Sequence, residues 1–217
     1  MKKIYYLLVI SVLFLVSCKT QLLDQNKTYI PEEENSVLDN SKAVATNANV
    51  FYFIRHCEPN GNSKTNPHLS KAGIKRAHLY KTFFANKSID TVFSTNLNRT
   101  FDTSSIIAKT KGQRVYFYDP FDIDYVKFLE NHKSNSLVII GHSNTTPEFV
   151  NGVLGKYKYS QMVDDNYSNI YKVSILNGKI ISNQILVLEK EIQKIEDAKL
   201  SPSELRKVLR QRKKNKK

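Results

Sequence analysis

Cysteine is scarce in this sequence, and long apolar runs are missing. The chain of 217 residues contains two cysteines, Cys18 and Cys57. The apolar run near its start, IYYLLVISVLFLV, has 13 residues, whereas a helix needs about 20 to cross a bilayer. No internal repeat is visible, and no histidines have the spacing of metal ligands. These absences argue against a disulfide framework, a membrane-spanning helix, a repeat array and a structural zinc site.

The short apolar run has the setting of an export signal. Two lysines precede it, and the tetrapeptide LVSC begins with its last two residues and ends at Cys18. LVSC resembles the lipobox of bacterial lipoproteins, which implies that Cys18 is lipidated and becomes the N-terminus. We therefore expect residues 1–18 to be a signal peptide and the protein to be a membrane-anchored lipoprotein of the cell envelope, on its periplasmic or surface side. A plain secretory signal is the alternative. With Cys18 lipidated, Cys57 has no partner for an internal disulfide.

The net charge of +13 is concentrated at the two ends of the chain. Residues 199–217 hold nine Lys or Arg and one Glu, and the first 18 residues hold two lysines, so the part between them is only mildly basic. Together with the predicted export, this distribution argues against a nucleic-acid partner. Residues 19–48 are polar and lack aliphatic periodicity, and we expect a flexible tether there.

Strand-like and helix-like runs alternate through the middle of the chain. Apolar runs predict strands at 49–54, 90–94, 114–118 and 136–141, and helical spacing predicts helices at 70–84, 97–109, 122–132 and 146–154. In the second of these helices, the spacing places a stripe of Leu97, Phe101, Ser104 and Ala108 on one face. The runs NIYKVSI and KIISNQILVL, joined by LNGK, predict a closing β-hairpin. This order predicts a three-layer α/β/α sandwich with a mostly parallel central sheet.

Two of the five histidines stand directly after predicted strands. Arg55 and His56 follow the strand at 49–54, and His142 follows the strand at 136–141. The carboxyl ends of parallel strands meet at one edge of an α/β sheet, where ligands bind. We therefore expect both imidazoles at the same edge.

Arg99 is expected at that edge as well. It lies in the first turn of the predicted helix 97–109, where a cation opposes the helix dipole, and strand 90–94 ends just before it. A residue that breaks a local rule in such a place favours a functional role. Two guanidiniums, those of Arg55 and Arg99, can clamp a phosphate dianion. A neutral histidine can attack phosphorus, and a second, protonated histidine can stabilise the developing charge, so the pattern predicts a phosphate site.

Four segments in this order are similar to the motifs of a known family. They are RHC at 55–57, LSKAGIKRA at 69–77, FSTNLNRTFDTS at 93–104 and VIIGHSN at 138–144. Through them residues 49–188 resemble the histidine phosphatase superfamily, with its phosphoglycerate mutase-like fold, although Cys57 stands where the family has glycine. The resemblance implies a phosphoric monoester hydrolase that needs no metal or cofactor and acts on a small phosphorylated substrate or a phosphohistidine. It also implies that His56 is phosphorylated and that the phosphate is bound by Arg55, Arg99 and His142.

The proton donor is the role that the resemblance leaves open. Ser143 and Asn144 follow His142, where one branch of the family has an acid. Carboxylates stand instead at Glu58 and, in the segment YDPFDIDY, at Asp119, Asp122 and Asp124. Of these we favour Asp119 or Glu58. A substrate with a good leaving group, such as a phosphohistidine or an acyl phosphate, would need no strong acid.

Three other functions compete with the phosphatase interpretation. A phosphoglycerate or phosphosugar mutase has the same fold, but the acidic motif typical of mutases is missing, and export would separate the protein from cytosolic metabolites. A binding protein that keeps the phosphate pocket without turnover is compatible with the open question of the donor. A cysteine phosphatase would need an arginine six residues after Cys57, where this chain has Ser63.

Residues 189–217 lie beyond the resemblance and are predicted to form a helical, basic tail. Spacing predicts one helix over 189–200, and SPSE predicts a second helix capped by Ser201, with Pro202 at its first position and Glu204 in a capping box. The tail either keeps the protein soluble or binds an anionic lipid surface or another polyanion.

Overall fold

The computed structural model describes residues 48–61 and 65–215. The predicted signal peptide, with Cys18, and all of the predicted tether except Ala48 lie outside the described residues. Within the described ranges, no helix is both long and apolar enough to cross a membrane.

Six strands form one sheet in the order β3-β2-β4-β1-β5-β6. The strands are β1 Asn49–Arg55, β2 Thr91–Ser94, β3 Val115–Phe117, β4 Leu137–Gly141, β5 Asn169–Leu176 and β6 Lys179–Val187. Strands β1 to β4 pair with one another in parallel. Strand β5 pairs antiparallel with β1, and β6 pairs antiparallel with β5. The predicted mostly parallel sheet and its closing hairpin are both confirmed.

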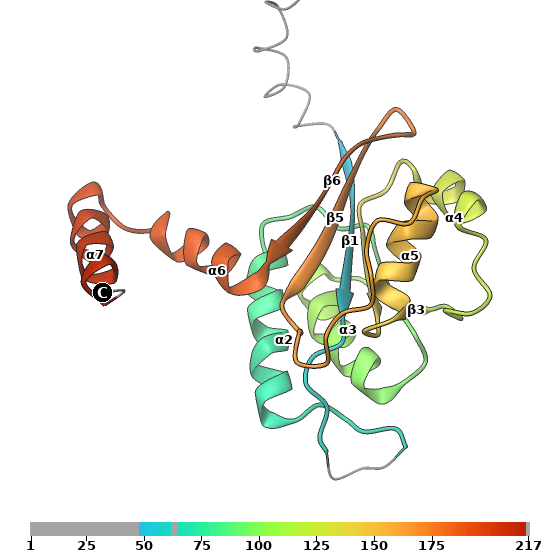
Figure 1. Ribbon diagram of the computed structural model, residues 1–217, viewed down its shortest axis with the longest axis horizontal. Helices are drawn as coiled ribbons and strands as arrows, with labels where there is room; N and C mark the ends of the chain where they lie inside the picture. The colour runs from blue at the N-terminus through green and yellow to red at the C-terminus, as the bar shows by residue number, and fades with distance from the viewer. Residues whose placement is uncertain (1–47, 62–64, 216–217) are drawn as a thin grey trace, which may run out of the picture. The chain divides into compact units, whose positions relative to one another are not determined.

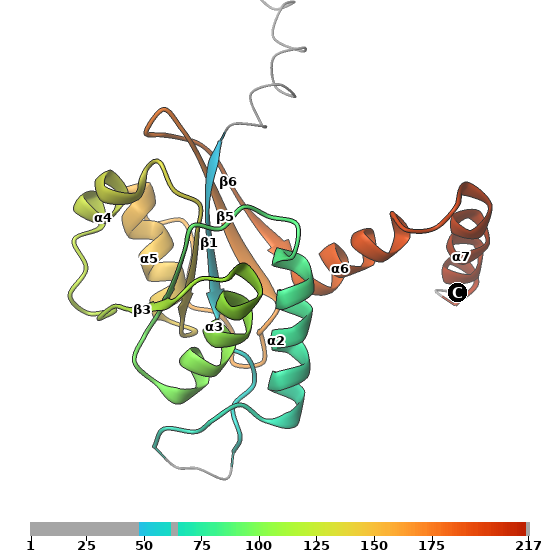
Figure 2. The same ribbon diagram turned by 180° about the vertical axis from the view of Figure 1, so that it is seen from behind.

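Helices cover both faces of this sheet. They are α2 Lys71–Phe84, α3 Asn98–Lys111, α4 Tyr125–His132, α5 Thr145–Leu154 and α6 Leu188–Asp197, and a further helix, α7 Pro202–Lys214, follows α6. Figures 1 and 2 show α2 and α6 on one side of the sheet and α4 and α5 on the other. Side chains of α3 join those of α2 and α6 in one hydrophobic cluster.

The continuous apolar sequence of β1 follows from burial on both of its faces. Tyr52 and Ile54 pack in the cluster beneath α2, α3 and α6, whereas Phe51 and Phe53 pack in the cluster beneath α4 and α5. Alternate side chains of one strand thus enter two different cores, as is typical of a parallel strand in the middle layer of three. The predicted α/β/α sandwich is confirmed.

The buried face of α3 differs from the predicted stripe. Phe101 is 44% exposed, and the buried residues of the helix are Thr100, Thr103, Ser104, Ile107 and Ala108. The threonines can be buried because their hydroxyls are hydrogen-bonded: that of Thr100 donates to the Leu97 carbonyl, and that of Thr103 accepts from the Cys57 amide. The helix is therefore rotated away from the apolar spacing, and the Phe101 ring instead contacts the ring of Phe117 on β3, with centroids 5.7 Å apart.

The hairpin between β5 and β6 is closed by Asn177 and Gly178. Their φ angles of 50° and 73° both lie in the left-handed region, which a two-residue turn of this kind requires and which Asn and Gly adopt most readily. The Asn-Gly signal therefore predicted the turn correctly.

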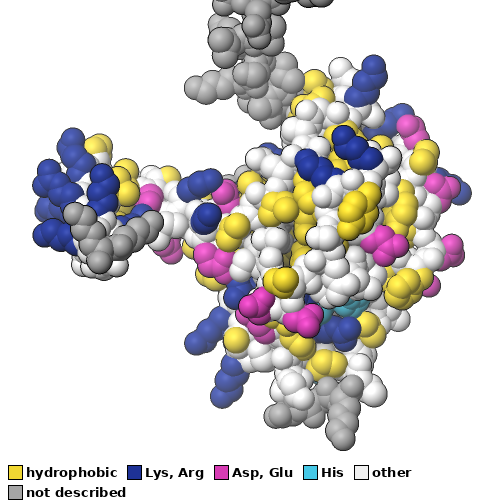
Figure 3. All heavy atoms as spheres, viewed as in Figure 1, with side chains coloured by type: hydrophobic (Ala, Val, Ile, Leu, Met, Phe, Trp, Pro, Cys, Tyr) yellow, Lys and Arg dark blue, Asp and Glu magenta, His cyan; other side chains and the backbone are white. Residues whose placement is uncertain are grey.

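The tail begins as part of the core. Leu188 and Ile192 of α6 are buried in the same cluster as α2 and α3. The second helix, α7, has the predicted capping box: the Ser201 hydroxyl accepts from the Glu204 amide, and the Glu204 carboxylate accepts from the Ser201 amide. No residue of α7 is buried, and Figure 3 shows its Lys and Arg side chains gathered in dark blue.

Candidate active site

The ends of β1 and β4 place the two histidines side by side. Arg55, the last residue of β1, is in register with Gly141, the last residue of β4. The His56 amide then donates to the Gly141 carbonyl at 3.0 Å, and the rings of His56 and His142 lie 5.3 Å apart between centroids. A side chain at position 141 would collide with the hydroxyl of Thr146, so glycine lets that hydroxyl lie close to the backbone at the end of β4.

One tautomer of His56 is fixed by its hydrogen bonds. Nδ1 lies 2.7 Å from the Cys57 carbonyl, which can only accept, so Nδ1 carries the proton. Nε2 therefore has a free lone pair, and the Arg99 Nε–H donates to it at 3.2 Å. The ring is almost wholly buried. Its one unprotonated nitrogen thus faces the cation that sequence analysis assigned to phosphate binding.

Arg55 is held by the segment that precedes β5. Its Nη1 donates to the carbonyls of Val163, Asp164 and Asn166, the shortest of these bonds being 2.8 Å to Asp164. Its guanidinium carbon lies 4.2 Å from the centre of the Tyr167 ring. Its Nε is buried and has no hydrogen-bond partner in the structure. Sequence analysis missed Tyr167 and these carbonyls, because a backbone carbonyl carries no residue-type signal.

Arg99 and Thr95 orient the second histidine. The Arg99 Nη2 lies 3.4 Å from His142 Nδ1, and a guanidinium can only donate, so Nδ1 is the acceptor. The opposite nitrogen, Nε2, then carries the proton and donates to the Thr95 hydroxyl at 2.9 Å. Thr95 was not among the predicted site residues, although its position directly after β2 is a signal of the same kind as those of the histidines.

Burial and neighbouring positive charges keep both imidazoles neutral at neutral pH. Burial, together with His142, Arg99 and Arg55 nearby, lowers the pKa of His56 to about 3. Burial and the same two guanidiniums lower the pKa of His142 to about 4. Burial and Arg55 also lower the pKa of Arg99. The site is thus a concentration of positive charge, and a bound dianion would oppose these shifts.

These residues line a pocket of about 950 Å³. Four of them are Arg55, His56, Arg99 and His142, and the remaining described lining residues are Pro59, Thr65, Pro67, Thr95, Asn96, Leu97, Phe117, Tyr118, Asp119, Pro120, Phe121, Ser143, Asn144 and Thr145. The structure therefore brings together all four residues that sequence analysis assigned to a phosphate site. Within the described ranges, no group of three or more His, Cys, Asp or Glu side chains is arranged to hold a metal ion.

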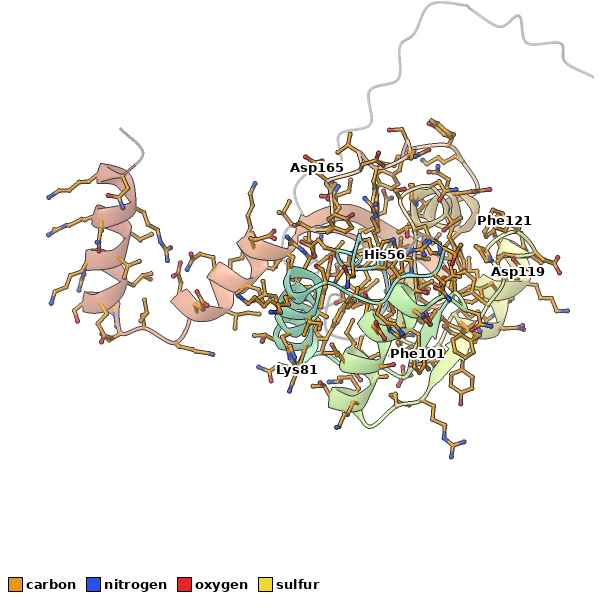
Figure 4. All side chains as sticks on the ribbon, turned by 90° about the horizontal axis from the view of Figure 1, so that it is seen from below. His56, Lys81, Phe101, Asp119, Phe121 and Asp165 are labelled. Carbon is orange, nitrogen blue, oxygen red and sulfur yellow. The ribbon has the colours of Figure 1, made fainter. Side chains whose placement is uncertain are left out.

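The two favoured carboxylates lie in different places. Asp119 lines the pocket, and its Oδ1 accepts from the Phe121 amide at 2.9 Å; Figure 4 shows both residues on one side of His56. Glu58 is not among the lining residues, and its Oε1 accepts from Arg76 Nε at 2.8 Å. Asp124, a further acid of that segment, caps α4 by accepting from the Lys127 amide.

The Cys57 side chain is directed away from this chemistry. It is fully buried in the cluster beneath α2 and α3, and burial raises the pKa of its thiol to about 12. Its backbone alone serves the site, through the carbonyl that binds His56. A cysteine nucleophile needs an accessible thiolate, so the structure argues against the cysteine-phosphatase alternative.

Comparisons with known proteins find similarity in the fold and in part of the sequence. Residues 51–122 match the sequence model of the histidine phosphatase superfamily, branch 1. The protein histidine phosphatase SixA, in a structure with tungstate, superposes with a TM-score of 0.52 at 13% identity, over 65% of this chain and 98% of SixA. A candidate alpha-ribazole-5′-P phosphatase from Escherichia coli K-12 superposes with a TM-score of 0.51 at 13% identity, over 65% of this chain and 97% of the other. No curated protein sequence matches the chain significantly. The chain thus has the histidine phosphatase fold and carries, over residues 51–122, the sequence pattern of branch 1 of that superfamily.

Proposed function

We propose that the protein is a phosphatase that hydrolyses phosphomonoesters or phosphoamidates through a phosphohistidine on His56. The observation that carries this proposal is the fixed state of that ring: Nδ1–H is bound to the Cys57 carbonyl while Nε2 keeps its lone pair beside Arg99. The attacking nitrogen must be unprotonated and directed at the bound phosphorus. The pKa of about 3 keeps the His56 ring neutral at neutral pH, with Nε2 unprotonated.

In the first step the substrate dianion replaces the contact between Arg99 and Nε2. Its oxygens are bound by Arg55, Arg99 and His142, and the Nε2 lone pair forms a bond to phosphorus as the bond to the leaving group breaks. The imidazole becomes a cation, and the Cys57 carbonyl stabilises it through Nδ1–H. The leaving group takes a proton from Asp119, the carboxyl group in the pocket lining.

In the second step water attacks the phosphohistidine. The Asp119 carboxylate, now ionised, accepts a proton from this water as its oxygen bonds to phosphorus and the bond from phosphorus to Nε2 breaks. Inorganic phosphate leaves, and His56 returns to its neutral tautomer. His142 gains a proton while the pocket holds an anion, because the added negative charge raises the pKa that burial and the two guanidiniums lower.

Phosphoamidates belong in this proposal because of the leaving group. A phosphohistidine releases an imidazole, which needs little help from an acid, so such a substrate depends less on Asp119 than an alkyl phosphate does. The name of the structural neighbour SixA, a protein histidine phosphatase, supports testing this class.

The test is to trap the intermediate. Brief incubation with a labelled aryl phosphate and rapid quenching should leave acid-labile, alkali-stable phosphate on the wild-type protein and none on His56→Ala. Cys57→Ala is the control and should still be labelled, because its thiol has no chemical role. Labelling of His56→Ala at the wild-type level would overturn the mechanism. Absence of turnover on every phosphomonoester and phosphoamidate tried would favour the alternative of a binding protein.

We also propose that the protein is anchored in the cell envelope through a lipid on Cys18. The support is the order of lysines, short apolar run and LVSC at residues 1–18, all of them outside the described part of the chain. Cys18→Ser should release the protein from membranes, as measured by fractionation after a high-salt wash. A mutant that stays bound after that wash would contradict the proposal, whereas one released only by salt would point to the basic tail as a second contact.

A further inference from the structure

We propose that Phe117 and Phe121 form an aromatic platform at the mouth of the phosphate pocket and that the preferred substrates are phosphomonoesters whose alcohol carries an uncharged aromatic ring. This inference rests on the proposed function and names the substrate class of the same site.

Exposed aromatic side chains gather at the mouth of the pocket. Phe117 is 53% exposed and Phe121 is 82% exposed, and both line the pocket. The exposed ring of Phe101 supports Phe117 from α3, with centroids 5.7 Å apart. Single exposed phenylalanines are ordinary, but two that line one pocket indicate a surface that another apolar group covers.

The platform is tied to the catalytic carboxylate. The Phe121 amide donates to Asp119 Oδ1 at 2.9 Å, so the ring and the proposed proton donor belong to one hydrogen-bonded turn. Figure 4 shows Asp119 and Phe121 together on one side of His56. In such a substrate, the aromatic ring that packs on this turn is joined through the alcohol to the ester oxygen that Asp119 is proposed to protonate. Binding of the ring therefore helps to place the scissile bond beside its proton donor.

The charges of the pocket disfavour a second acidic group on the substrate. Among the described lining residues, Arg55 and Arg99 are the two that carry a positive charge at neutral pH, and both are assigned to the phosphate. The remaining acidic side chain in that lining is Asp119, so a substrate carboxylate would lose its hydration there without a cation to pair with, and it would lie beside a second acidic group. An uncharged ring meets neither cost, and it gains contact with two phenylalanines.

The size of the expected preference follows from aromatic packing. A well-placed pair of rings stabilises a complex beyond the effect of buried area alone, and two such contacts should give a preference of roughly tenfold in kcat/KM. Aryl phosphates are better leaving groups whatever the pocket does. The comparison must therefore keep the leaving group constant.

A matched pair of substrates meets this condition. 2-Phenylethyl phosphate and ethyl phosphate both release a primary alkoxide and differ in the ring. We expect kcat/KM to be roughly tenfold higher for the first. A second pair, 3-phosphoglycerate and glycerol 3-phosphate, tests the charge, and we expect no advantage for the carboxylate. Equal rates for the first pair, or a tenfold advantage for 3-phosphoglycerate, would overturn the inference.

Variants then assign the preference to the platform. Phe117→Ala and Phe121→Ala should each reduce the ratio of the first pair, and the double variant should bring it close to one. Tyr116→Ala is the matched control, because Tyr116 is the neighbour of Phe117 on β3, is also 53% exposed and lies outside the pocket lining. A ratio that falls equally in the Tyr116 variant would contradict the assignment.

A binding measurement separates this inference from the proposed function. Phenethylphosphonate and ethylphosphonate cannot be hydrolysed, and their affinities are measured by calorimetry on the whole protein. Tighter binding of the first, lost in the Phe117 and Phe121 variants, supports the platform even if no ester is turned over. Equal affinities together with normal turnover would leave the phosphatase standing and remove the platform.

Discussion

Asp119 and Glu58 are two carboxylates that the fold treats differently. Glu58 lies two residues after the proposed nucleophile, yet its carboxylate is bound by Arg76, which also contacts Ser168 and Glu189. Asp119 lies 63 positions along the chain from His56 and nevertheless lines the same pocket. Proximity in sequence to His56 therefore does not place a carboxylate in the pocket, whereas the parallel strands that meet at one edge bring Asp119 there.

This difference predicts the outcome of two matched substitutions. Asp119→Asn should lower kcat for an alkyl phosphate by roughly 10²–10⁴-fold, the usual contribution of a general acid, and much less for an acyl phosphate. Glu58→Gln should change both rates little. Steady-state kinetics on the two substrates checks this. A larger loss in Glu58→Gln than in Asp119→Asn would reverse the assignment.

Arg99 and His142 should respond differently when each is removed. Arg99 donates to both imidazoles and is proposed to bind the anion in ground state and transition state, so Arg99→Ala should weaken vanadate binding and lower turnover, each by roughly ten- to two-hundred-fold. His142→Ala should lower turnover more than it weakens vanadate binding, since His142 is proposed to act mainly on the charge that develops on the transferring phosphoryl group in the transition state. Vanadate inhibition constants and kcat, measured for the same preparations at pH 7.5, decide between them. The reverse order of effects would contradict the roles given.

The four principal site residues could be predicted because each stands at a position with local meaning. Arg55, His56 and His142 follow apolar strands, and Arg99 opposes a helix dipole. Tyr167 could not be found in this way. The segment that contains Tyr167 lacks periodicity. This segment contacts Arg55 through backbone carbonyls and the Tyr167 ring, and these contacts form only in the folded chain.

The elements that could be predicted from the sequence are those determined by residues close together in the chain. The Asn-Gly hairpin and the Ser201 capping box are determined by residues that contact each other directly, so their sequence is sufficient. The buried face of α3 does not coincide with the face that holds Phe101, because hydrogen bonds let two threonines be buried in place of an apolar stripe. Such replacement depends on partners elsewhere in the chain, Leu97 and Cys57, which spacing does not reveal.

Helix α6 is an element that the resemblance did not cover, and its packing can be tested. Leu188 is fully buried in the cluster of α2 and α3, whereas Leu209 of α7 is 44% exposed. Leu188→Ala should lower the free energy of unfolding by about 2–5 kcal/mol, and Leu209→Ala should change it by less than about 0.5 kcal/mol. Urea unfolding of both variants provides the comparison. Similar small losses would show that α6 is not part of the cooperative fold.

At the scale of the whole molecule, the buried histidines make stability depend on pH. Below pH about 6.5 the unfolded chain takes up a proton on each imidazole, whereas folded His56 and His142 resist protonation until about pH 3 and 4. The unfolded state therefore binds more protons in this window, and folding stability falls as the pH falls. At pH 5 the loss is on the order of 2 kcal/mol for each histidine.

Sulfate should restore part of this loss. It remains a dianion from pH 7.5 to 5, and in the folded pocket its negative charge should raise the pKa of His142, which burial and the two guanidiniums lower. Urea unfolding at both pH values should show a larger stabilisation by sulfate at pH 5, with chloride at equal ionic strength as the control. In His142→Gln the gain on acidification should disappear. An equal effect of sulfate at both pH values in the wild type would contradict the link between anion and proton.

The burial of Cys57 affects how the protein should respond to oxidants. Peroxide attacks thiolates, and the one cysteine within the described ranges is kept as a neutral thiol, without contact with solvent. The proposed nucleophile is an imidazole, and the described lining residues of the pocket include no sulfur atom that peroxide could oxidise. Under an oxidative burst that silences phosphatases with a cysteine nucleophile, this protein should continue to turn over its substrate.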